Sequence, residues 1–325
     1  MRPILSPCVM SSPRSIVFAG SGGGRGVLSA LAVTMICCSV ARGQAPTKLV
    51  SVDSTLTTRD GQEIKITYFK SPLGQEAPVV ILLPGKGGNR LIWKPFAEQL
   101  QKVDFAVITV DMRGHGESAG AGAASGSSTK KPEPPKKGEF IGMAFDLDAV
   151  KRFLFEEHQT KQLNMNKLGI VASDIIAPVA IVFTEADWLK EPHDDAAVPG
   201  LRTPRGQDVQ ALALLSPEAS APGLGTPKSL AFIRTLGRTA VLITVGSKNT
   251  TDLAAAKKMQ EILDPKNERG KKDIFLEQYD TKLHGTNLLG QGLKTEQHLY
   301  TFLMKHVKET TNASPWRDRK SKLLD

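Results

Sequence analysis

A regular alternation of apolar and amphipathic segments begins near Lys48 and constrains the fold of this chain more than any other feature. Short continuous runs of Val, Ile and Leu, such as PVVILLP, FAVITVD and TAVLITVG, are typical of strands buried on both faces of a sheet. Amphipathic segments of helical length separate these runs. The pattern therefore predicts an α/β fold, with a mostly parallel sheet that is covered by helices on both faces.

The individual elements can be placed from the same pattern. Two polar–apolar segments flank Arg59, Asp60 and Gly61, which predicts an antiparallel hairpin at the start of the sheet. Six further strands follow, so we expect eight strands in all. The predicted helices cover residues 91–103, 142–158, 175–183, 228–236, 251–263 and 295–307.

Residues 1–43 differ in kind from the rest. They contain four arginines, no acidic residue and no lysine, together with an apolar run of about 14 residues. A membrane-spanning helix needs about 20 apolar residues, so this run is short for a span. We predict an export signal, cleaved before Gln44, and a periplasmic or extracellular mature protein. An uncleaved N-terminal membrane anchor and a true start at Met10 are the alternatives.

The composition excludes several functional classes. All the cysteines, Cys8, Cys37 and Cys38, lie in the predicted signal, so the mature protein would have no disulfide and no thiolate metal site. Loss of the four signal arginines lowers the formal charge from +9 to +5. No basic stripe interleaved with aromatic residues is visible, so we expect no nucleic-acid partner. We also expect no cofactor, no metal and no membrane span in the mature protein. A small-molecule ligand or substrate remains open, as does a protein partner.

Three segments interrupt or follow the regular pattern. Residues 119–139 are rich in Gly and Ser and then in Lys and Pro, which predicts a flexible surface insertion. Residues 185–208 are rich in turn formers and would wrap over an edge of the sheet, where they could form part of a small lid. The segment after Pro217 is too short for a large lid domain. We therefore expect one domain over residues 44–312 and a basic C-terminal tail over residues 313–325.

Three motifs carry a resemblance to a known family. LLPGKGG at residues 82–88, DMRGHGES at 111–118 and LHGTNLL at 283–289 resemble, in order, the loops after the third and fourth strands and the histidine loop of α/β-hydrolases. The resemblance covers about Leu49 to Val307. It implies an α/β-hydrolase fold with an eight-stranded sheet, a catalytic histidine at His284, and oxyanion-hole amides at Lys86 and Ile175. It also implies that His115 has a structural part.

The nucleophile position departs from the family pattern. In KLGIVASDIIAPVA, residues 167–180, Asp174 occupies the position of the family's nucleophilic serine, and Ala172 and Ile176 replace the flanking glycines. We expect Ile176 to collide with the preceding strand or to push the turn open, because a β-branched side chain is large there. Using Ser173 as the nucleophile fits worse. Some relatives use a nucleophilic aspartate, so Asp174 does not by itself exclude catalysis.

The acid position is altered as well. Asn249 occupies the family's usual acid position behind His284, and an amide cannot stabilise an imidazolium ion as a carboxylate does. Glu218 and Asp252 are possible displaced acids. Asp252, however, also fits a helix cap, and Glu218 also fits a solvated loop. His193 lies near acidic residues, but the sequence shows no further ligand for a metal site there.

Two main hypotheses follow for the function. The first is a catalytically degenerate α/β-hydrolase relative that acts as a binding module, with Asp174 serving only to cap the following helix. The second is an active hydrolase of esters or epoxides, with Asp174 as nucleophile and His284 as base. An esterase that uses Ser173 is a third and weaker hypothesis.

Overall fold

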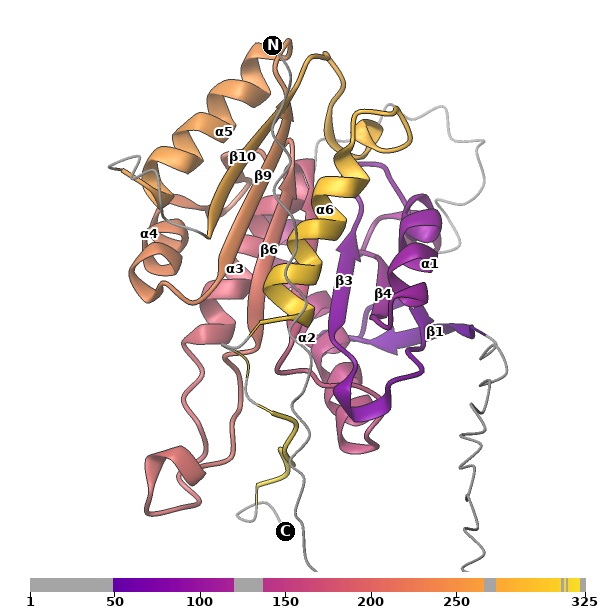
Figure 1. Cartoon of the computed structure of the whole chain (residues 1–325), viewed down its shortest axis with the longest axis vertical. Helices are drawn as coiled ribbons and strands as arrows, with labels where there is room; N and C mark the ends of the chain where they lie inside the picture. The colour runs from indigo at the N-terminus through magenta and orange to yellow at the C-terminus, as the bar shows by residue number, and fades with distance from the viewer. Residues whose placement is uncertain (1–48, 120–136, 266–272, 311–312, 314, 322–325) are drawn as a thin grey trace, which may run out of the picture. The chain divides into compact units, whose positions relative to one another are not determined.

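An eight-stranded sheet forms the framework of the protein (Figure 1). The computed structural model describes residues 49–119, 137–265, 273–310, 313 and 315–321. The sheet has the order β1-β2-β4-β3-β5-β6-β9-β10. Its strands are β1 (Ser51–Thr57), β2 (Glu63–Phe69), β3 (Val79–Leu83), β4 (Ala106–Asp111), β5 (Leu168–Ser173), β6 (Val209–Leu215), β9 (Ala240–Gly246) and β10 (Ile274–Tyr279).

The sheet is parallel from β4 to β10, and only the edge formed by β1 and β2 is antiparallel. The hairpin predicted around Arg59 is present, with Thr57 opposite Glu63 next to the turn. The predicted α/β fold with a mostly parallel eight-stranded sheet is confirmed.

Helices connect the strands. The α-helices are α1 (Lys94–Lys102), α2 (Lys137–Gln159), α3 (Ala177–Trp188), α4 (Pro227–Leu236), α5 (Thr250–Leu263) and α6 (Thr295–Leu303). Shorter helical turns are η1 (Gly74–Glu76), η2 (Arg90–Trp93), η3 (Gly116–Ala119), η4 (Asp174–Ile176), η5 (Pro199–Leu201), η6 (Gly285–Leu288) and η7 (Met304–Lys308).

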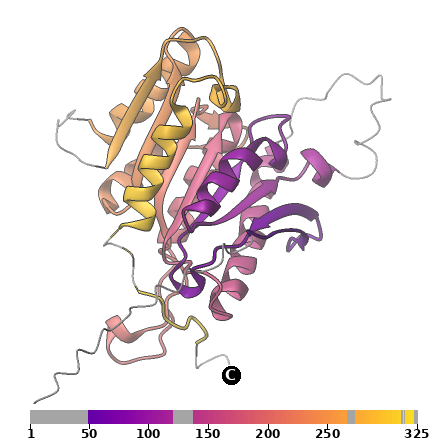
Figure 2. The ribbon, with the colours of Figure 1, turned by 45° about the vertical axis from the view of Figure 1, so that its right-hand side comes forward.

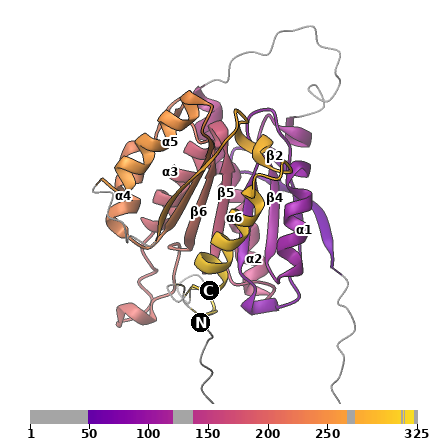
Figure 3. The same cartoon turned by 45° about the horizontal axis from the view of Figure 1, so that its top comes forward.

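The helices cover both faces of the sheet, as Figures 2 and 3 show. Side chains alternate between the faces along each strand, so one strand supplies two cores. In β3, Ile81 belongs to the core under α2, α3, α4 and α5, whereas Val80 and Leu82 belong to the core under α1 and α6. This double burial explains why the strands are continuous apolar runs.

The segments that interrupt the pattern are short or lie at the edges. Helix α2 begins at Lys137, so the last residues of the predicted insertion at 119–139 are helical, and residues 120–136 lie outside the described part. Between β6 and α4 there is only a small two-stranded ladder, β7 (Ser220–Ala221) with β8 (Leu224–Gly225). The predicted signal at residues 1–43 also lies outside the described residues. No described helix has both the length and the apolar character that a membrane span requires.

Part of the predicted C-terminal tail packs against α2. The Trp316 ring stacks on His158 with 5.1 Å between ring centroids, and Trp316 Nε1 donates to the His158 carbonyl at 3.1 Å. Arg319 is buried and donates to the Asp208 carboxylate. Residues 315–321 are therefore fixed by specific contacts, although residues 313–325 were predicted to lie beyond the domain.

Candidate active site

The sharp turn after β5 places Asp174 at the carboxyl edge of the sheet. Asp174 has φ of +57°, in the left-handed region, and the preceding Ser173 is extended. A left-handed backbone costs a residue other than glycine about 1–2 kcal/mol, so the surrounding structure must hold it. Ser173 lies inside the fold, where its Oγ donates to the Leu215 carbonyl at 3.4 Å. The geometry therefore presents Asp174 and not Ser173.

Glycines in neighbouring loops make room for this turn. A Cβ atom at Gly85 would lie 3.0 Å from the Asp174 Cβ, and one at Gly285 would lie 2.8 Å from the Ser173 Oγ. Ile176 points into the core and is fully buried. The predicted collision at Ile176 is thus wrong, because the turn closes with the isoleucine packed beneath it. Both glycines stand in the LLPGKGG and LHGTNLL motifs, but the motifs alone do not reveal this contact because the turn after β5 is distant in the sequence.

His284 links two carboxylates. It lies in the loop after β10, and its Nε2 is 3.0 Å from the Asp174 Oδ1. On the other side of the ring, Nδ1 is 2.6 Å from the Asp252 Oδ2. Asp252 lies in the first turn of α5, which follows β9. Three segments that follow the carboxyl ends of different strands therefore meet at one imidazole. The arrangement has the geometry of a nucleophile, a base and an orienting acid.

The structure corrects the placement of Asn249 and Asp252. Asn249 is the N-cap of α5, and its side chain accepts a hydrogen bond from the Asp252 amide at 3.3 Å. A cap needs a residue with a non-helical backbone, and Asn249 has φ of −91° and ψ of +96°. Asp252 stands three residues into the turn, so its carboxylate is free to reach His284. The carboxylate that contacts His284 Nδ1 is therefore that of Asp252, one of the two displaced acids predicted, and lies three residues after Asn249.

Two backbone amides were predicted to form an oxyanion hole. The Lys86 amide donates to the Asp174 Oδ2 at 3.1 Å, so this amide does point at the candidate nucleophile. Ile175 lies in η4, directly after Asp174, and is almost fully buried. The loop after β3 thus supplies one donor at the atom where negative charge would develop.

Glu218 lies beside Asp174 and does not stand behind His284. Its amide donates to the Asp174 carbonyl at 3.3 Å, and its carboxyl group hydrogen-bonds with that of Asp174. Burial, followed by the negative charge of Asp174, raises the pKa of Glu218. At a given pH, Glu218 is therefore protonated more often than a free glutamic acid side chain.

The charges in this cluster shift the pKa values in opposite directions. The hydrogen bond with Asp174 raises the pKa of His284 to about 9; burial acts against this, and the hydrogen bond with Asp252 adds to it. Burial disfavours the charged form of Asp174, but the bond to His284 outweighs this and lowers its pKa. The imidazolium form thus prevails at neutral pH while Asp174 is free.

The DMRGHGES motif supports this edge of the sheet. The buried Asp111 carboxylate accepts hydrogen bonds from the backbone amides of Arg90 and Glu117 and pairs with the Arg90 guanidinium. Arg113 bridges Asp146 at 2.8 Å and Asp60 at 2.7 Å. The His115 Nδ1 lies 2.9 Å from the Arg113 carbonyl of the same loop, so in this structure His115 contacts its own loop and not the cluster.

Access to the site is partial. About 37% of the His284 side chain and 13% of the Asp174 side chain are exposed. A cavity of about 270 Å³ lies beside the loop that follows His284, between Thr286 and Asn287 of that loop and Phe96 of α1. Within the described residues, His, Cys, Asp and Glu side chains form no group of three or more that could hold a metal ion, and this includes His193.

Comparison with known proteins agrees with the fold described above. A sequence model of the α/β-hydrolase fold family matches residues 78–165. Solved structures with the same arrangement include an esterase of Pyrococcus furiosus, 15% identical over 80% of this chain and 92% of that protein, with a TM-score of 0.56. This chain has the α/β-hydrolase fold.

Two further α/β-hydrolase-fold structures are similar. A dienelactone hydrolase of Anabaena variabilis is 15% identical over 80% of this chain and 99% of that protein, with a TM-score of 0.54. A Rhizomucor miehei esterase is 14% identical over 81% of this chain and 85% of its own, with a TM-score of 0.52. Among curated proteins, no sequence matches this chain significantly. These identities are low, so the similarity establishes the fold alone.

Proposed function

We propose that this protein is a hydrolase in which Asp174 is the nucleophile, His284 the base and Asp252 the acid that orients the base. The observation that carries the proposal is the His284 ring, which contacts Asp174 through Nε2 and Asp252 through Nδ1. Asp174 also adopts the left-handed turn that presents a nucleophile at the end of a strand. Suitable substrates are small molecules with an electrophilic carbon, and epoxides or esters fit best.

For an epoxide, the reaction has two steps. An Asp174 carboxylate oxygen attacks a ring carbon, the carbon–oxygen bond of the epoxide breaks, and an ester with Asp174 forms. The released alkoxide takes a proton from the His284 imidazolium, whose Nε2 lies 3.0 Å from Asp174 Oδ1, and this leaves the ring neutral. Water then attacks the carbonyl carbon of the ester, and collapse of the tetrahedral intermediate releases the diol.

The second step needs His284 as a base. The ring has given its proton to the alkoxide, and the ester no longer carries the negative charge of Asp174 that contributes most to the raised pKa of His284. The neutral ring can therefore accept a proton from water. Asp252 stays ionised and holds the ring in place. The Lys86 amide, 3.1 Å from Oδ2, donates to the oxyanion of the intermediate.

Oxygen labelling tests the proposal. A single turnover of the protein with styrene oxide in water labelled with oxygen-18 should place the label in the Asp174 side chain, because water attacks the carbonyl carbon of the ester. Mass spectrometry of the peptide that contains Asp174 reads the result. His284→Gln should accumulate the ester adduct instead, whereas His298→Gln, whose ring contacts Tyr279, should turn over normally. Turnover without label in Asp174 contradicts the mechanism.

A noncatalytic binding module is the second candidate. Each oxygen of the Asp174 carboxylate already has a partner, His284 or the Lys86 amide, and little of the side chain is exposed. A closed network of this kind also fits a structural role. Absence of turnover with epoxides and short acyl esters, together with absence of an adduct in His284→Gln, would favour this candidate.

Export is part of the proposal and rests on the sequence of residues 1–43. The mature protein would be periplasmic or extracellular, or anchored at its N-terminus if the signal is not cleaved. Mass spectrometry of protein from its native source should find an N-terminus near Gln44. Intact residues 1–40 in a cytoplasmic fraction would contradict export.

A further inference from the structure

A second cavity lies at the opposite edge of the sheet. It has a volume of about 220 Å³ and is lined by residues of α2, of the hairpin turn between β1 and β2, of the segment between α3 and β6, and of the C-terminal segment. Met165 and Arg205 come shortly before β5 and β6, so the cavity lies at the amino ends of the parallel strands. Asp174 and His284 follow the carboxyl ends. The cavity is therefore separate from the candidate active site.

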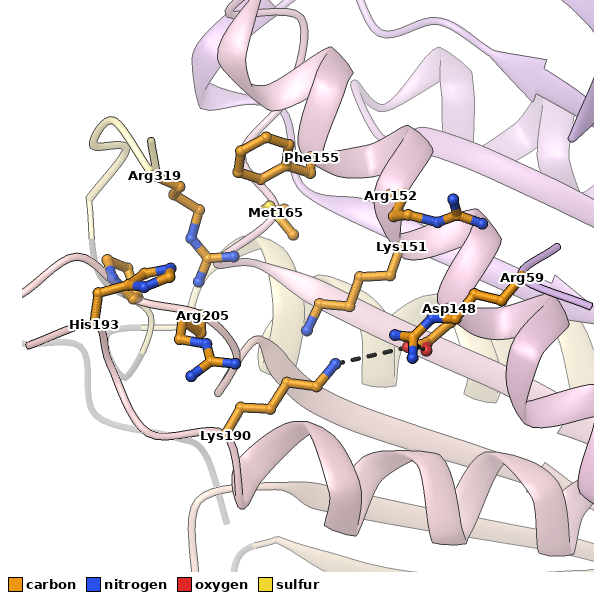
Figure 4. Close-up of a pocket in the computed structure, with 11 residues that line it drawn as sticks. Arg59, Asp148, Lys151, Arg152, Phe155, Met165, Lys190, His193, Arg205 and Arg319 are labelled. Carbon is orange, nitrogen blue, oxygen red and sulfur yellow. Dashed lines mark ion pairs between the residues drawn. The ribbon is translucent and has the colours of Figure 1, made fainter. Parts of the chain in front are cut away.

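Positive charge dominates this cavity. Six cationic side chains line it: Arg59, Lys151, Arg152, Lys190, Arg205 and Arg319. Figure 4 shows the nitrogen-bearing ends of Lys151, Lys190 and Arg205 directed into the same space. The cations come from four separate segments of the chain, so the fold, and not a local run of basic residues, brings them together.

Carboxylates neutralise only part of this charge. Asp148 pairs with Arg59 at 2.8 Å and lies 3.7 Å from Lys190. Asp208, behind the cavity, pairs with Lys151 at 2.7 Å and with Arg319, and Asp187 also contacts Lys151. Six cations thus face three carboxylates, which leaves an excess of three positive charges.

Arg152 and Arg205 carry much of the unneutralised charge. Arg152 donates to the Thr57 carbonyl at 2.9 Å, and within the described part of the chain no carboxylate pairs with Arg152 or Arg205. Both residues are exposed at the mouth of the cavity. The Arg205 guanidinium points into the same space as Lys151 and Lys190, whereas that of Arg152 points away from this space (Figure 4). Guanidinium groups bind phosphate and sulfate oxygens through two parallel hydrogen bonds, so Arg205 suits an oxyanion.

A further cation, Lys151, lies in the interior of the cavity, where burial disfavours its charge. Lys151 is buried, and burial lowers its pKa to about 8 even though Asp208 acts in the opposite direction. An anion bound beside Lys151 would stabilise its charged form. Phe155 and Met165 add an apolar wall. A ligand with an oxyanion and a small apolar part would therefore match both the charge and the lining.

We propose that this cavity binds a small molecule that carries a phosphate or sulfate group with at least two negative charges. Lys190 and Arg205 hold its oxygens at the mouth, and Lys151 faces it from the interior. The site is remote from Asp174, so it serves binding and not the hydrolytic step. The volume of the cavity suits one such group with a short organic part and is small for a polymer.

Titration calorimetry with inorganic pyrophosphate tests the proposal. Pyrophosphate should bind with one site per chain, and sodium chloride at the same ionic strength should not compete fully with it. Lys190→Gln combined with Arg205→Gln should weaken binding at least about tenfold, the loss of one or more charge-assisted hydrogen bonds. Sulfate in place of pyrophosphate shows which oxyanion is preferred, and tight binding of either supports the site.

A matched control separates the site from general charge. Lys257→Gln combined with Lys258→Gln removes the same charge from exposed positions on α5 and should leave binding unchanged. Equal weakening by both double variants, or binding that chloride abolishes at matched ionic strength, would overturn the proposal. Thermal unfolding without ligand checks that each variant is folded. Hydrolysis by the Lys190 and Arg205 variant should match the wild type, so this result is independent of the proposed function.

Discussion

At the scale of residues, a single histidine connects the side chains of the candidate site. His284 contacts Asp174 on one side and Asp252 on the other, and the three side chains come from loops after β10, β5 and β9. Two carboxylates on one ring favour the imidazolium ion, so the free site holds one positive charge between two negative charges. In the proposed mechanism this state precedes attack by Asp174, after which the ring acts as a base.

The raised pKa of His284 predicts a pH dependence of stability. The pKa is about 9 in the folded protein and about 6.5 in an unfolded chain, so the stabilisation is complete below pH 6.5 and is lost as the pH rises to about 9. The full shift corresponds to about 3 kcal/mol, and because more than a third of the ring is exposed we expect about 1 kcal/mol. Urea unfolding of wild type and His284→Gln between pH 6 and pH 10 measures it. Parallel stability curves for the two proteins would contradict the expectation.

Asp252 and Asn249 should have separable roles. Asp252→Asn keeps the shape of the side chain but removes the charge behind His284, so we expect kcat to fall by about 10² to 10⁴ with little loss of stability. Asn249→Ala removes only the helix cap and should cost about 1 kcal/mol of unfolding free energy, with kcat nearly unchanged. Steady-state kinetics and urea unfolding of both variants decide the matter. A large fall in kcat for Asn249→Ala, with kcat nearly unchanged for Asp252→Asn, would assign the acid position to Asn249 instead.

At the scale of elements, the turn after β5 depends on the loops that pack against it. Gly85 follows β3 and Gly285 follows β10, and each comes close to the residues of this turn. The family's glycines around the nucleophile are absent here, at Ala172 and Ile176. Room for the turn is thus supplied by neighbouring elements, and the loops that carry Lys86 and His284 are drawn toward Asp174 at the same time.

A pair of glycine substitutions tests this packing. Gly285→Ala would place a Cβ 2.8 Å from the Ser173 Oγ, at a residue with φ of +58°. Gly290→Ala has a similar φ of +73° in the same loop but meets no atom within 4 Å. Both should lose about 1–2 kcal/mol for the left-handed backbone, but only Gly285→Ala should also lower kcat, by about 10². Equal kinetics in the two variants would show that the contact does not position the site.

At the scale of the whole molecule, a buried ion cluster ties the C-terminal segment to the domain. Arg319 is nearly fully buried and donates to Asp208 at 2.9 Å, and Lys151 lies 2.7 Å from the same carboxylate. The cluster links residues far apart in the sequence, on α2, before β6 and after α6. Its loss should therefore destabilise the entire domain and not only the last residues.

Arg319→Met should lower the free energy of unfolding by about 3–5 kcal/mol, because it removes one of the two cations that pair with the buried Asp208 carboxylate. Adding Asp208→Asn should recover part of this loss. Lys320→Met changes an exposed neighbour and should stay within about 0.5 kcal/mol of the wild type. Urea unfolding followed by circular dichroism measures all three. A loss below about 1 kcal/mol for Arg319→Met would mean that the C-terminal segment contributes little to the stability of the domain.

The sequence by itself determined the fold, the order of the strands along the chain and the identity of Asp174 and His284 as the candidate pair. A strand that is buried on both faces needs a continuous run of apolar residues, so it can be predicted from the sequence. Short motifs identify the loops after those strands. Only the tertiary structure decided whether Asn249 or Asp252 contacts His284. The two residues are three positions apart, and the Asp252 side chain contacts the histidine whereas that of Asn249 caps the helix. The tertiary structure also decided the room around Asp174 and the cationic cavity, because both arise from segments that are distant in the chain. Local patterns record burial and turns, whereas the distance between side chains on different loops depends on how the whole sheet is assembled.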